Sequence, residues 1–371
     1  MVKRPSRRAY LGQWILLAAL AAVAWLLVSN AADNLARRNM SFGFGFLADR
    51  TNFDIPFRLI PWIESDSYAW ALLLCFLNTL LVAAMGVVTS TFIGLFVGIM
   101  RLSANWLVRN IALGFIELVR NTPQLVQIIF WYVAVLQTLP GPRQSIVLPG
   151  GVLLNIRGFY LPDPVMGADG ALFSWLALAL VVATPLIWRV RLGAARFGAK
   201  SLVLPALAVG LLIAGIDRIE WPQLKGFNIA GGIQVPPELV ALWAGLSIYS
   251  SAFIAEIVRG SIEAIPKGQQ EAALSLGLKP AQRLFLIILP QAVRIMVPPL
   301  TSQYMNLIKS SSLGAAVAYP ELFQIFLGTV VNQTDRVLEV VIIVMVTFLS
   351  INLVTSAFMN WYNRRVALVE R

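Results

Sequence analysis

The stretch P-K-G-Q-Q-E-A-A-L-S-L-G-L-K-P-A-Q-R-L-F-L-I-I-L-P, residues 266–290, is a short charged segment between two apolar runs. Pro266 suits the first turn of a helix, where a missing N–H costs no hydrogen bond. Gly277 suits the left-handed residue that commonly ends a helix. Lys267 and Glu271 are four residues apart, which predicts an ion pair along the helix. The sequence therefore predicts a short, capped helix that begins at Pro266 and ends at Gly277.

The predicted helix carries small side chains on one face. Ala272, Ala273 and Leu276 share that face at helical spacing. Small side chains allow another protein surface to approach the helix closely. A plain surface helix of good helix formers, joining two apolar runs, is the alternative interpretation.

The same stretch resembles the E-A-A…G…I-x-L-P signature of ATP-binding-cassette importer permeases. Glu271-Ala272-Ala273, Gly277, Ile287 and Leu289-Pro290 fill its fixed positions. In that family this loop is the coupling helix, which docks in a cleft of the ATPase subunit and transmits its closure. The residues that the resemblance assigns to this coupling are Pro266, Gly268, Glu271, Ala272, Ala273, Leu276 and Gly277.

The composition is that of a membrane protein. Of the 371 residues, 58% are hydrophobic and the mean hydropathy is +0.76, far too apolar for a soluble fold. The net charge of +11 could suggest nucleic acid, but the Lys and Arg residues cluster at the ends of apolar runs, as the positive-inside rule describes. The single cysteine, Cys75, excludes an intrachain disulfide. Because the chain has no histidine, zinc binding and proton relay are disfavoured, and we predict no metal site.

Apolar runs predict an all-α, polytopic membrane protein of about eight transmembrane helices. The predicted spans are residues 11–28, 69–100, 111–139, 171–188, 202–216, 237–258, 284–308 and 337–362. The expected inner segments are residues 1–13, 101–110, 189–200, 259–283 and 361–371. Since the inner segments hold most of the basic residues, both termini and the helix that begins at Pro266 are expected in the cytosol.

The order of these runs divides the chain into four parts. Residues 1–68 would hold the first span and an aromatic, interfacial segment on the outer side. Residues 69–139 and 238–371 would form the two parts of a core. Residues 140–237 would be an insertion with an outer loop and two extra spans. This loop is rich in proline and glycine and shows no strong periodicity.

Two predicted spans carry charged residues, which need a partner or a cavity inside a membrane. Glu117 and Arg120, three residues apart in the third span, predict a structural ion pair. Glu256 and Arg259 repeat this spacing in the sixth span. Pro123 predicts a kink beside the first pair. A direct role of the Glu117–Arg120 pair in substrate binding is the other interpretation.

Longer stretches resemble the permeases of polar amino-acid importers, the histidine, glutamine and general L-amino-acid group. These stretches are E-L-V-R-N-T-P-Q-L-V-Q at 117–127, Y-S-S-A-F-I-A-E-I-V-R-G-S-I-E-A-I-P-K-G-Q-Q-E-A-A at 249–273, L-P-Q-A-V-R-I-M-V-P-P-L at 289–300 and N-L-I-K-S-S-S-L at 306–313. Length and insertion look most like the longer permease of general or acidic L-amino-acid systems. Many relatives read K-D-T-S-L where this chain has K-S-S-S-L at 309–313, which leaves the preferred substrate charge open.

The resemblance implies a transport subunit of the type I importer fold, not an enzyme, that works by alternating access. ATP and Mg would bind a separate ATPase, since the chain contains no Gly-Lys pair typical of a phosphate-binding loop, and no cofactor is expected in this chain. The implied location is the bacterial inner membrane. The implied partners are a second, homologous permease, two ATP-binding subunits, a periplasmic amino-acid-binding protein, an amino-acid substrate and the lipid bilayer, with no nucleic acid.

Recognition of an amino acid needs a cation or a helix N-terminus for the carboxylate and oxygen acceptors for the ammonium group. Residues of these kinds near the expected cavity are Gln124, Tyr249, Ser250, Ser251, Asn306, Lys309 and Ser312. Hydroxyls that satisfy the backbone of kinked helices, and a lysine that extends to the membrane interface, are the alternative interpretations.

Two other classes of protein stay open from the residues alone. An ion-coupled secondary transporter would carry paired acids near the middle of broken spans, and only Glu117 and Glu256 could serve. A structural membrane scaffold would need no coupling helix.

Overall fold

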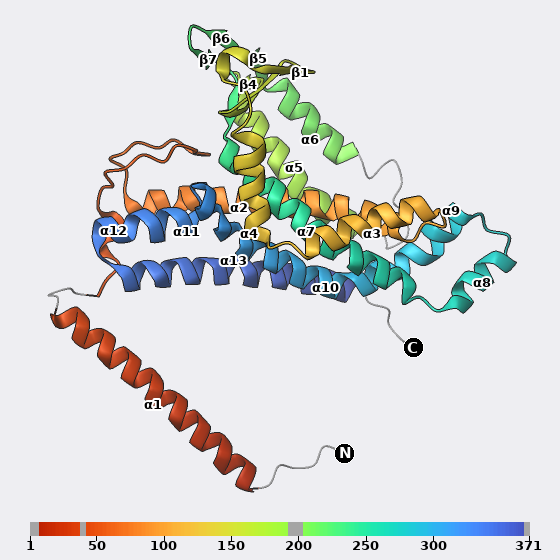
Figure 1. Ribbon diagram of the computed structural model, residues 1–371, viewed down its shortest axis with the longest axis horizontal. Coiled ribbons are helices and arrows are strands. Elements are labelled where there is room, and N and C mark those ends of the chain that lie inside the picture. Colours follow the sequence, from red (N-terminus) through yellow and green to blue (C-terminus); the bar gives the residue numbers. More distant parts are fainter. Residues whose placement is uncertain (1–6, 38–41, 192–202, 367–371) are drawn as a thin grey trace.

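The computed structural model describes residues 7–37, 42–191 and 203–366 of the chain (Figure 1). Most of these residues are helical. The helices are α1 (Arg7–Arg37), α2 (Tyr68–Arg101), α3 (Trp106–Arg120), α4 (Gln124–Ile129), α5 (Gly170–Arg191), α6 (Val203–Ala214), α7 (Pro237–Glu263), α8 (Lys267–Ser275), α9 (Pro280–Arg283), α10 (Leu289–Ser310), α11 (Leu322–Ile325), α12 (Val331–Thr334) and α13 (Val337–Val366). The strands are β1 (Ile146–Leu148), β2 (Val152–Asn155), β3 (Gly158–Leu161), β4 (Asp163–Met166), β5 (Ile216–Glu220), β6 (Gln223–Lys225), β7 (Asn228–Ala230) and β8 (Ile233–Val235).

Four helices in the described ranges are long and apolar enough to cross a membrane. They are α2, α7, the helical run Leu284–Val317 that contains α10, and α13, and they coincide with the predicted second, sixth, seventh and eighth spans. The described parts of the other four predicted spans hold shorter apolar stretches, at residues 12–23 of α1, 124–136 across α4 and its π-helical continuation, 170–180 of α5 and 203–214 of α6. The expected inner segment at 189–200 and both chain ends fall partly on residues outside the described ones.

The long helices form a bundle with α8 and α9 at one end and α11 and α12 at the other (Figure 1). α7 packs against α2, α10 and α3, and α10 also packs against α13. α1 stands apart from the bundle in Figure 1, and its described apolar side chains, such as Trp25, are exposed. Exposed apolar side chains of this kind are expected on a helix that faces lipid.

Two glycines allow α2 and α7 to pack backbone against backbone. A Cβ atom at Gly94 would lie 2.5 Å from Cγ2 of Ile254, and one at Gly98 would lie 2.8 Å from the carbonyl oxygen of Ala255. The two glycines have the small-xxx-small spacing that brings membrane helices together. Any larger residue at either position would push the two helices apart.

The predicted third span, residues 111–139, is broken in the structure. α3 ends at Arg120, whereas α4 begins at Gln124 and continues as a π-helix to Leu136. Pro123 has no N–H to donate and disfavours helical backbone at the residue before it, so the helix stops there. The expectation of one continuous helix is therefore wrong, because the proline causes a break and not only a kink.

Side chains and a glycine stabilise this break. The side-chain amide of Gln127 donates to the carbonyl oxygens of Val119 at 2.9 Å and Thr122 at 3.3 Å, which have lost helical partners. Beyond the break α4 crosses α7, where a Cβ atom at Gly245 would lie 2.5 Å from Cγ1 of Ile128. The absence of a side chain at Gly245 lets α4 lie directly on α7.

Residues 140–237, the predicted insertion, contain β-structure in a part that was expected to be a loop. A four-stranded antiparallel sheet has the order β1-β2-β3-β8, while β4 pairs with β5 and β6 with β7. The strands lie beyond the ends of α5 and α6, to one side of the long helices (Figure 1). Gly158 is at φ +103°, and a Cβ atom there would clash with the carbonyl oxygen of Val235. Strands of three to five residues are too short to show an alternating pattern in the sequence.

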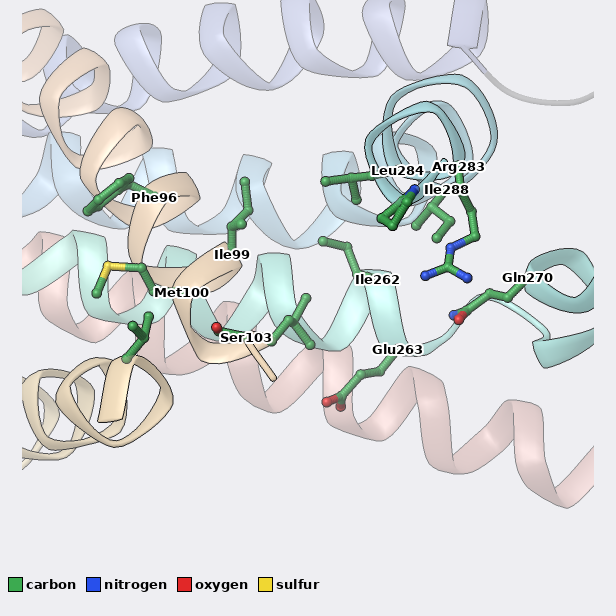
Figure 2. A pocket seen from close by; sticks show the side chains of 13 residues that line it. Phe96, Ile99, Met100, Ser103, Ile262, Glu263, Gln270, Arg283, Leu284 and Ile288 are labelled. Carbon is green, nitrogen blue, oxygen red and sulfur yellow. The ribbon is translucent and has the colours of Figure 1, made fainter. Parts of the chain in front are cut away.

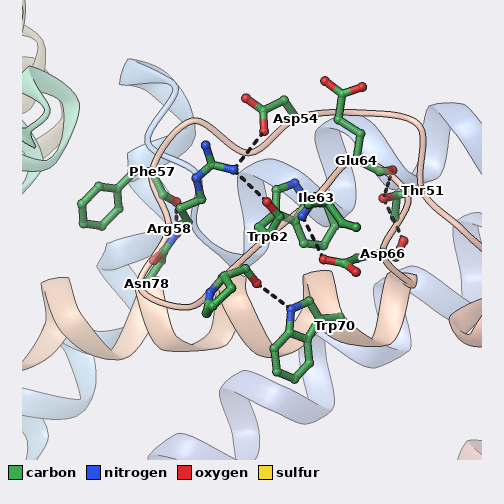
Figure 3. Close-up of polar contacts among 11 residues, drawn as sticks. Thr51, Asp54, Phe57, Arg58, Trp62, Ile63, Glu64, Asp66, Trp70 and Asn78 are labelled. Carbon is green, nitrogen blue, oxygen red and sulfur yellow. Dashed lines mark hydrogen bonds and ion pairs between the residues drawn. The ribbon is translucent and has the colours of Figure 1, made fainter. Parts of the chain in front are cut away.

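The segment at residues 42–67 lies over the start of α2 and contains only one turn of 3₁₀ helix (Figure 3). The indole N–H of Trp70 donates to the carbonyl oxygen of Pro61 at 2.9 Å. The side-chain amide of Asn78 donates to the carbonyl oxygen of Phe57 at 3.1 Å. These bonds from α2 hold an irregular segment whose backbone has few partners of its own.

A buried apolar cluster joins this segment to the C-terminal part of the chain. Ile55 and Trp62 pack in one cluster with Leu74 of α2, Phe326 and Val340. Burial of each large apolar side chain contributes about 1.5–3 kcal/mol where water is the alternative surrounding. The cluster therefore holds together residues that lie far apart in the sequence.

Candidate functional site

The helix predicted in the opening stretch is present as α8. Pro266 is its N-cap and Gly277, at φ +70°, lies just beyond its C-terminal end. The N–H of Leu278 donates to the carbonyl oxygen of Ala273 at 3.2 Å, and the N–H of Gly277 donates to that of Leu274 at 2.9 Å. This pair of bonds is the Schellman motif, which fixes the direction in which the chain leaves the helix.

The faces of α8 differ from the prediction in one respect. Ala273 points inward and is only 2% exposed, because it packs against the segment that leads into α10. Gly268, Ala272, Ser275 and Leu276 are exposed at positions that share the opposite face. Leu276 is 75% exposed and Leu274, two residues before it, is 57% exposed, so this end of the helix presents apolar side chains to its surroundings. Ala272 and Leu276 therefore share an open face as expected, but the inclusion of Ala273 in that face is wrong, because Ala273 packs inward.

The predicted ion pair on α8 does not form. Lys267 and Glu271 are both exposed, and no ion pair joins them among the residues that the structure describes. An exposed pair of this kind gains little because water screens the charges. A side-chain contact of 3.5 Å between Gln269 and Gln291 instead connects α8 to α10.

The predicted pair near the end of α7 is present and is part of a larger cluster. Nη2 of Arg259 lies 2.8 Å from Oε2 of Glu256, and Nη1 lies 2.5 Å from Oε2 of Glu263. Because Arg259 neutralises part of this acidic charge, Glu256 is not a free acid of the kind an ion-coupled transporter would use.

The predicted pair between Glu117 and Arg120 does not form. Both side chains are exposed on α3, and the guanidinium of Arg120 lies 5.0 Å from the ring centre of Phe253 on α7. A guanidinium over an aromatic face gains a cation–π attraction of about 0.5–1 kcal/mol at exposed sites. Arg120 therefore ties α3 to α7 and leaves Glu117 without the expected partner.

One face of α10 is polar and open. Asn306 and Lys309 are exposed, and Ser302, four residues before Asn306, is exposed on the same face. The hydroxyl of Ser312 donates to the carbonyl oxygen of Lys309 at 2.8 Å, so it serves the backbone. Sequence reasoning missed Ser302, although its spacing from Asn306 and Lys309 was visible. An exposed lysine and amide on a membrane-spanning helix indicate a water-filled cavity or a partner.

The remaining candidates are less open than this face of α10. Ser250 and Ser251 are buried in α7, and the hydroxyl of Ser251 donates to the carbonyl oxygen of Ile248 at 2.7 Å. Tyr249 is half-buried and packs on Phe253. The structure therefore does not place these three on the open face with Asn306 and Lys309.

Gln124 stands at the start of α4. Its side-chain nitrogen is buried and has no hydrogen-bond partner among the residues that the structure describes. A buried amide without a partner costs about 1–3 kcal/mol, so a further binding group would satisfy it.

A buried carboxyl group, which the sequence did not point to, lies at the opposite end of the bundle from α8. Glu321 is fully buried and caps α11 by accepting from the N–H groups of Phe323 at 2.8 Å and Gln324 at 2.7 Å. Burial raises the pKa of Glu321 to about 7, although the two backbone bonds oppose this increase. Asn78 donates to the carbonyl oxygen of Pro320 at 2.8 Å and so holds this loop on α2.

Comparison with known proteins matched this chain to a family model and, along nearly its whole length, to several known proteins. A model for the inner-membrane component of binding-protein-dependent transport systems matches residues 200–368. The chain is 43% identical to a putative amino-acid ABC transporter permease protein of Escherichia coli K12, over 99% of this chain and 96% of that protein. It is 42% identical to a general L-amino acid transport system permease protein of Rhizobium johnstonii, over 99% and 94%. It is 36% identical to a glutamate/glutamine/aspartate/asparagine transport system permease protein of Rhodobacter capsulatus, over 96% and 93%.

Proposed function

This chain belongs to the amino-acid ABC transporter permeases, the inner-membrane components of binding-protein-dependent transport systems, and on that basis we propose that α8 couples it to a separate ATPase. It is a permease subunit of an ABC importer and not an enzyme. It is also a multi-pass protein of the inner membrane. Importers of this family work with an ATPase and a binding protein.

The observation that carries the coupling role is the open face of α8. The helix stands at one end of the bundle, its exit is fixed by the Schellman motif, and its open face consists of small residues and Leu276. A small-faced helix admits close contact, and an exposed leucine supplies an apolar anchor for a pocket on a partner. The inner packing of Ala273 joins α8 to α10, so a force on α8 would move that span.

In the proposed complex the substrate is an L-amino acid that passes along the open polar face of α10. Lys309 attracts the carboxylate, while Asn306 and Ser302 offer oxygen atoms to the ammonium group. Gln124 completes the path if its amide turns to the substrate. Tyr249, Ser250, Ser251 and Ser312 have smaller roles in this proposal, since they are covered or bonded within the chain.

The assembly we propose contains a second, homologous permease, two ATP-binding subunits and a periplasmic amino-acid-binding protein. Each chain supplies one α8, so two permeases are needed to engage two ATP-binding subunits. ATP and Mg bind those subunits. The end of the bundle with α8 faces the cytosol, as both termini do. Residues 69–139 and 238–371 form the permease core in this proposal, whereas 1–68 and 140–237 are additions to it.

A matched pair of arginine substitutions tests the coupling role. Ala272→Arg places a long charged side chain on the open face of α8, whereas Ala104→Arg changes an exposed alanine in the α2–α3 turn at the same end of the bundle. We expect Ala272→Arg to lower binding-protein-stimulated ATP hydrolysis of the reconstituted complex roughly tenfold or more, because a loss of about 1.4 kcal/mol at the interface raises its dissociation constant tenfold. Ala104→Arg should leave the stimulation close to that of the unchanged complex.

Co-purification separates a failure of coupling from a failure of folding. Chain with Ala272→Arg should still insert in the membrane and bring less ATPase subunit through purification. Equal stimulation and equal co-purification for both variants would show that the ATPase contacts another surface.

A further inference from the structure

A pocket of about 620 Å³ lies at the end of the bundle that carries α8 (Figure 2). Three of the membrane-spanning runs begin or end beside it, since α2 ends at Arg101, α7 ends at Glu263, and the run that contains α10 begins at Leu284. The pocket therefore lies at the level where spans leave the bilayer. Its volume is within the range of about 300–1,000 Å³ found for sites of small ligands.

The lining of the pocket changes from apolar to polar across this boundary. Ile99 and Met100 of α2 and Ile288, just before α10, form apolar walls on the side of the spans. Arg283 and Gln270 lie on the side of α8 and α9. Figure 2 shows the guanidinium of Arg283 beside the amide of Gln270, across the pocket from Ile99 and Met100. The apolar side of the pocket therefore faces the membrane-spanning helices, and its polar side faces the membrane surface.

The pocket has one charge of each sign. Arg283 makes no ion pair within the part of the chain that the structure describes, so its guanidinium is available to an anion. Glu263 also lines the pocket, and Arg259 contacts only one of its two carboxylate oxygens. A purely anionic ligand would meet repulsion from Glu263, whereas a ligand with both a phosphate and an ammonium group would match both charges.

We propose that this pocket binds a phospholipid with a primary ammonium headgroup. Arg283 and Gln270 hold the phosphate, Glu263 accepts hydrogen bonds from the ammonium group, and the start of an acyl chain lies against Ile99 and Met100. A free amino acid carries the same two charges but has no chain to cover the apolar walls. A choline headgroup has no N–H to donate to Glu263.

Lipid binding here requires only that the chain spans a membrane, so it does not depend on the coupling role of α8. The pocket nevertheless touches α8 through Gln270 and α9 through Arg283. A lipid bound there would fill the space between α2 and the segment that leads from α8 to α10.

Native mass spectrometry of the purified complex tests the proposal directly. The complex is reconstituted in nanodiscs of phosphatidylethanolamine, phosphatidylcholine or phosphatidylglycerol and then released into mild detergent. We expect phosphatidylethanolamine to be retained most. Arg283→Gln and Glu263→Gln should each reduce its retention roughly tenfold, as expected for the loss of one charge-assisted hydrogen bond. Lys279→Gln, which removes an exposed charge outside the pocket, is the matched control.

Several results would overturn the proposal. Equal retention by Arg283→Gln and Lys279→Gln would place the retained lipid elsewhere. Preferential retention of phosphatidylglycerol would exclude a role for Glu263 with an ammonium group. Displacement of the lipid by a free amino acid would assign the pocket to a soluble ligand. Should Arg283→Gln fail to assemble, Arg283→Lys and the comparison of headgroups in the unchanged protein still decide the question.

Discussion

At the scale of single residues, buried polar groups in this permease mark the places where the backbone lacks regular partners. Glu321 caps α11 from a fully buried position, and Asn78 bonds the carbonyl oxygens of two different loops. Such groups cost free energy unless they are satisfied. Neither was visible in the sequence, because a lone Glu or Asn beside an apolar run is compatible with an exposed position.

Glu321 should make the stability of the protein depend on pH. Its pKa is higher in the folded chain, about 7, than its usual 4.5, so the folded state holds this proton more tightly. Stability should therefore decrease as pH rises from about 4.5 to about 7, by about 3 kcal/mol in total. Glu321→Gln cannot titrate but keeps an oxygen for the N–H groups at the start of α11. The variant should lose much less stability than the unchanged protein between about pH 5 and about pH 8.

Thermal unfolding of the detergent-purified chain at several pH values measures this difference. Glu64→Gln, which alters an exposed carboxyl, is the control and should behave like the unchanged protein. The same pH dependence in Glu321→Gln would assign the effect to other groups.

At the scale of helices, the sequence was informative where a helix is long and apolar. α2, α7, α10 and α13 stand where hydropathy placed them, and α8 ends at the glycine that its sequence indicates. The sequence was less informative at Pro123, because a proline inside an apolar run can kink a helix or break it. A break is stabilised over a kink by two features. The amide of Gln127 donates hydrogen bonds to the freed carbonyl oxygens, and Gly245 lets α4 lie across α7.

The contact of α2 with α7 predicts opposite effects for two glycine-to-alanine substitutions. Gly94→Ala puts a Cβ atom 2.5 Å from Ile254 and should destabilise the protein by about 1–3 kcal/mol through overpacking. Gly114→Ala, in α3, meets no atom within 4 Å and should be neutral or stabilising by up to about 1 kcal/mol. Thermal unfolding of the purified chains separates the two. A neutral Gly94→Ala would show that α2 and α7 can move apart without cost.

At the scale of the whole molecule, the four long apolar helices follow from composition and hydropathy, but the structure of the predicted insertion at residues 140–237 does not. Its strands are too short for a periodic signal, and the pairing of β3 with β8 joins residues that are more than 70 positions apart. The candidate site was only partly predictable for a related reason. Spacing alone put Asn306 and Lys309 on one helix, whereas exposure was needed to separate them from Ser250 and Ser251.

The open face of α10 predicts a specific defect in transport. Lys309→Gln removes the cation proposed to attract the substrate carboxylate, so uptake at low amino-acid concentration should fall roughly tenfold. ATP hydrolysis without substrate should stay unchanged, since α8 is intact. Lys225→Gln, an exposed change on β6, is the control. Unchanged uptake by Lys309→Gln in reconstituted vesicles would remove this face from the path.

The two hydrogen bonds that the Asn78 side chain donates limit where the protein can open. One amide holds the carbonyl oxygens of Phe57 and Pro320, and the hydroxyl of Tyr319 donates to the backbone of Asn78 at 3.1 Å. Because both loops are hydrogen-bonded to α2, we expect the two loops and the helix to move together. We therefore expect this end of the chain to move as one rigid unit during transport, so that opening occurs along its contact with a neighbouring subunit and not by separation of the two loops from α2.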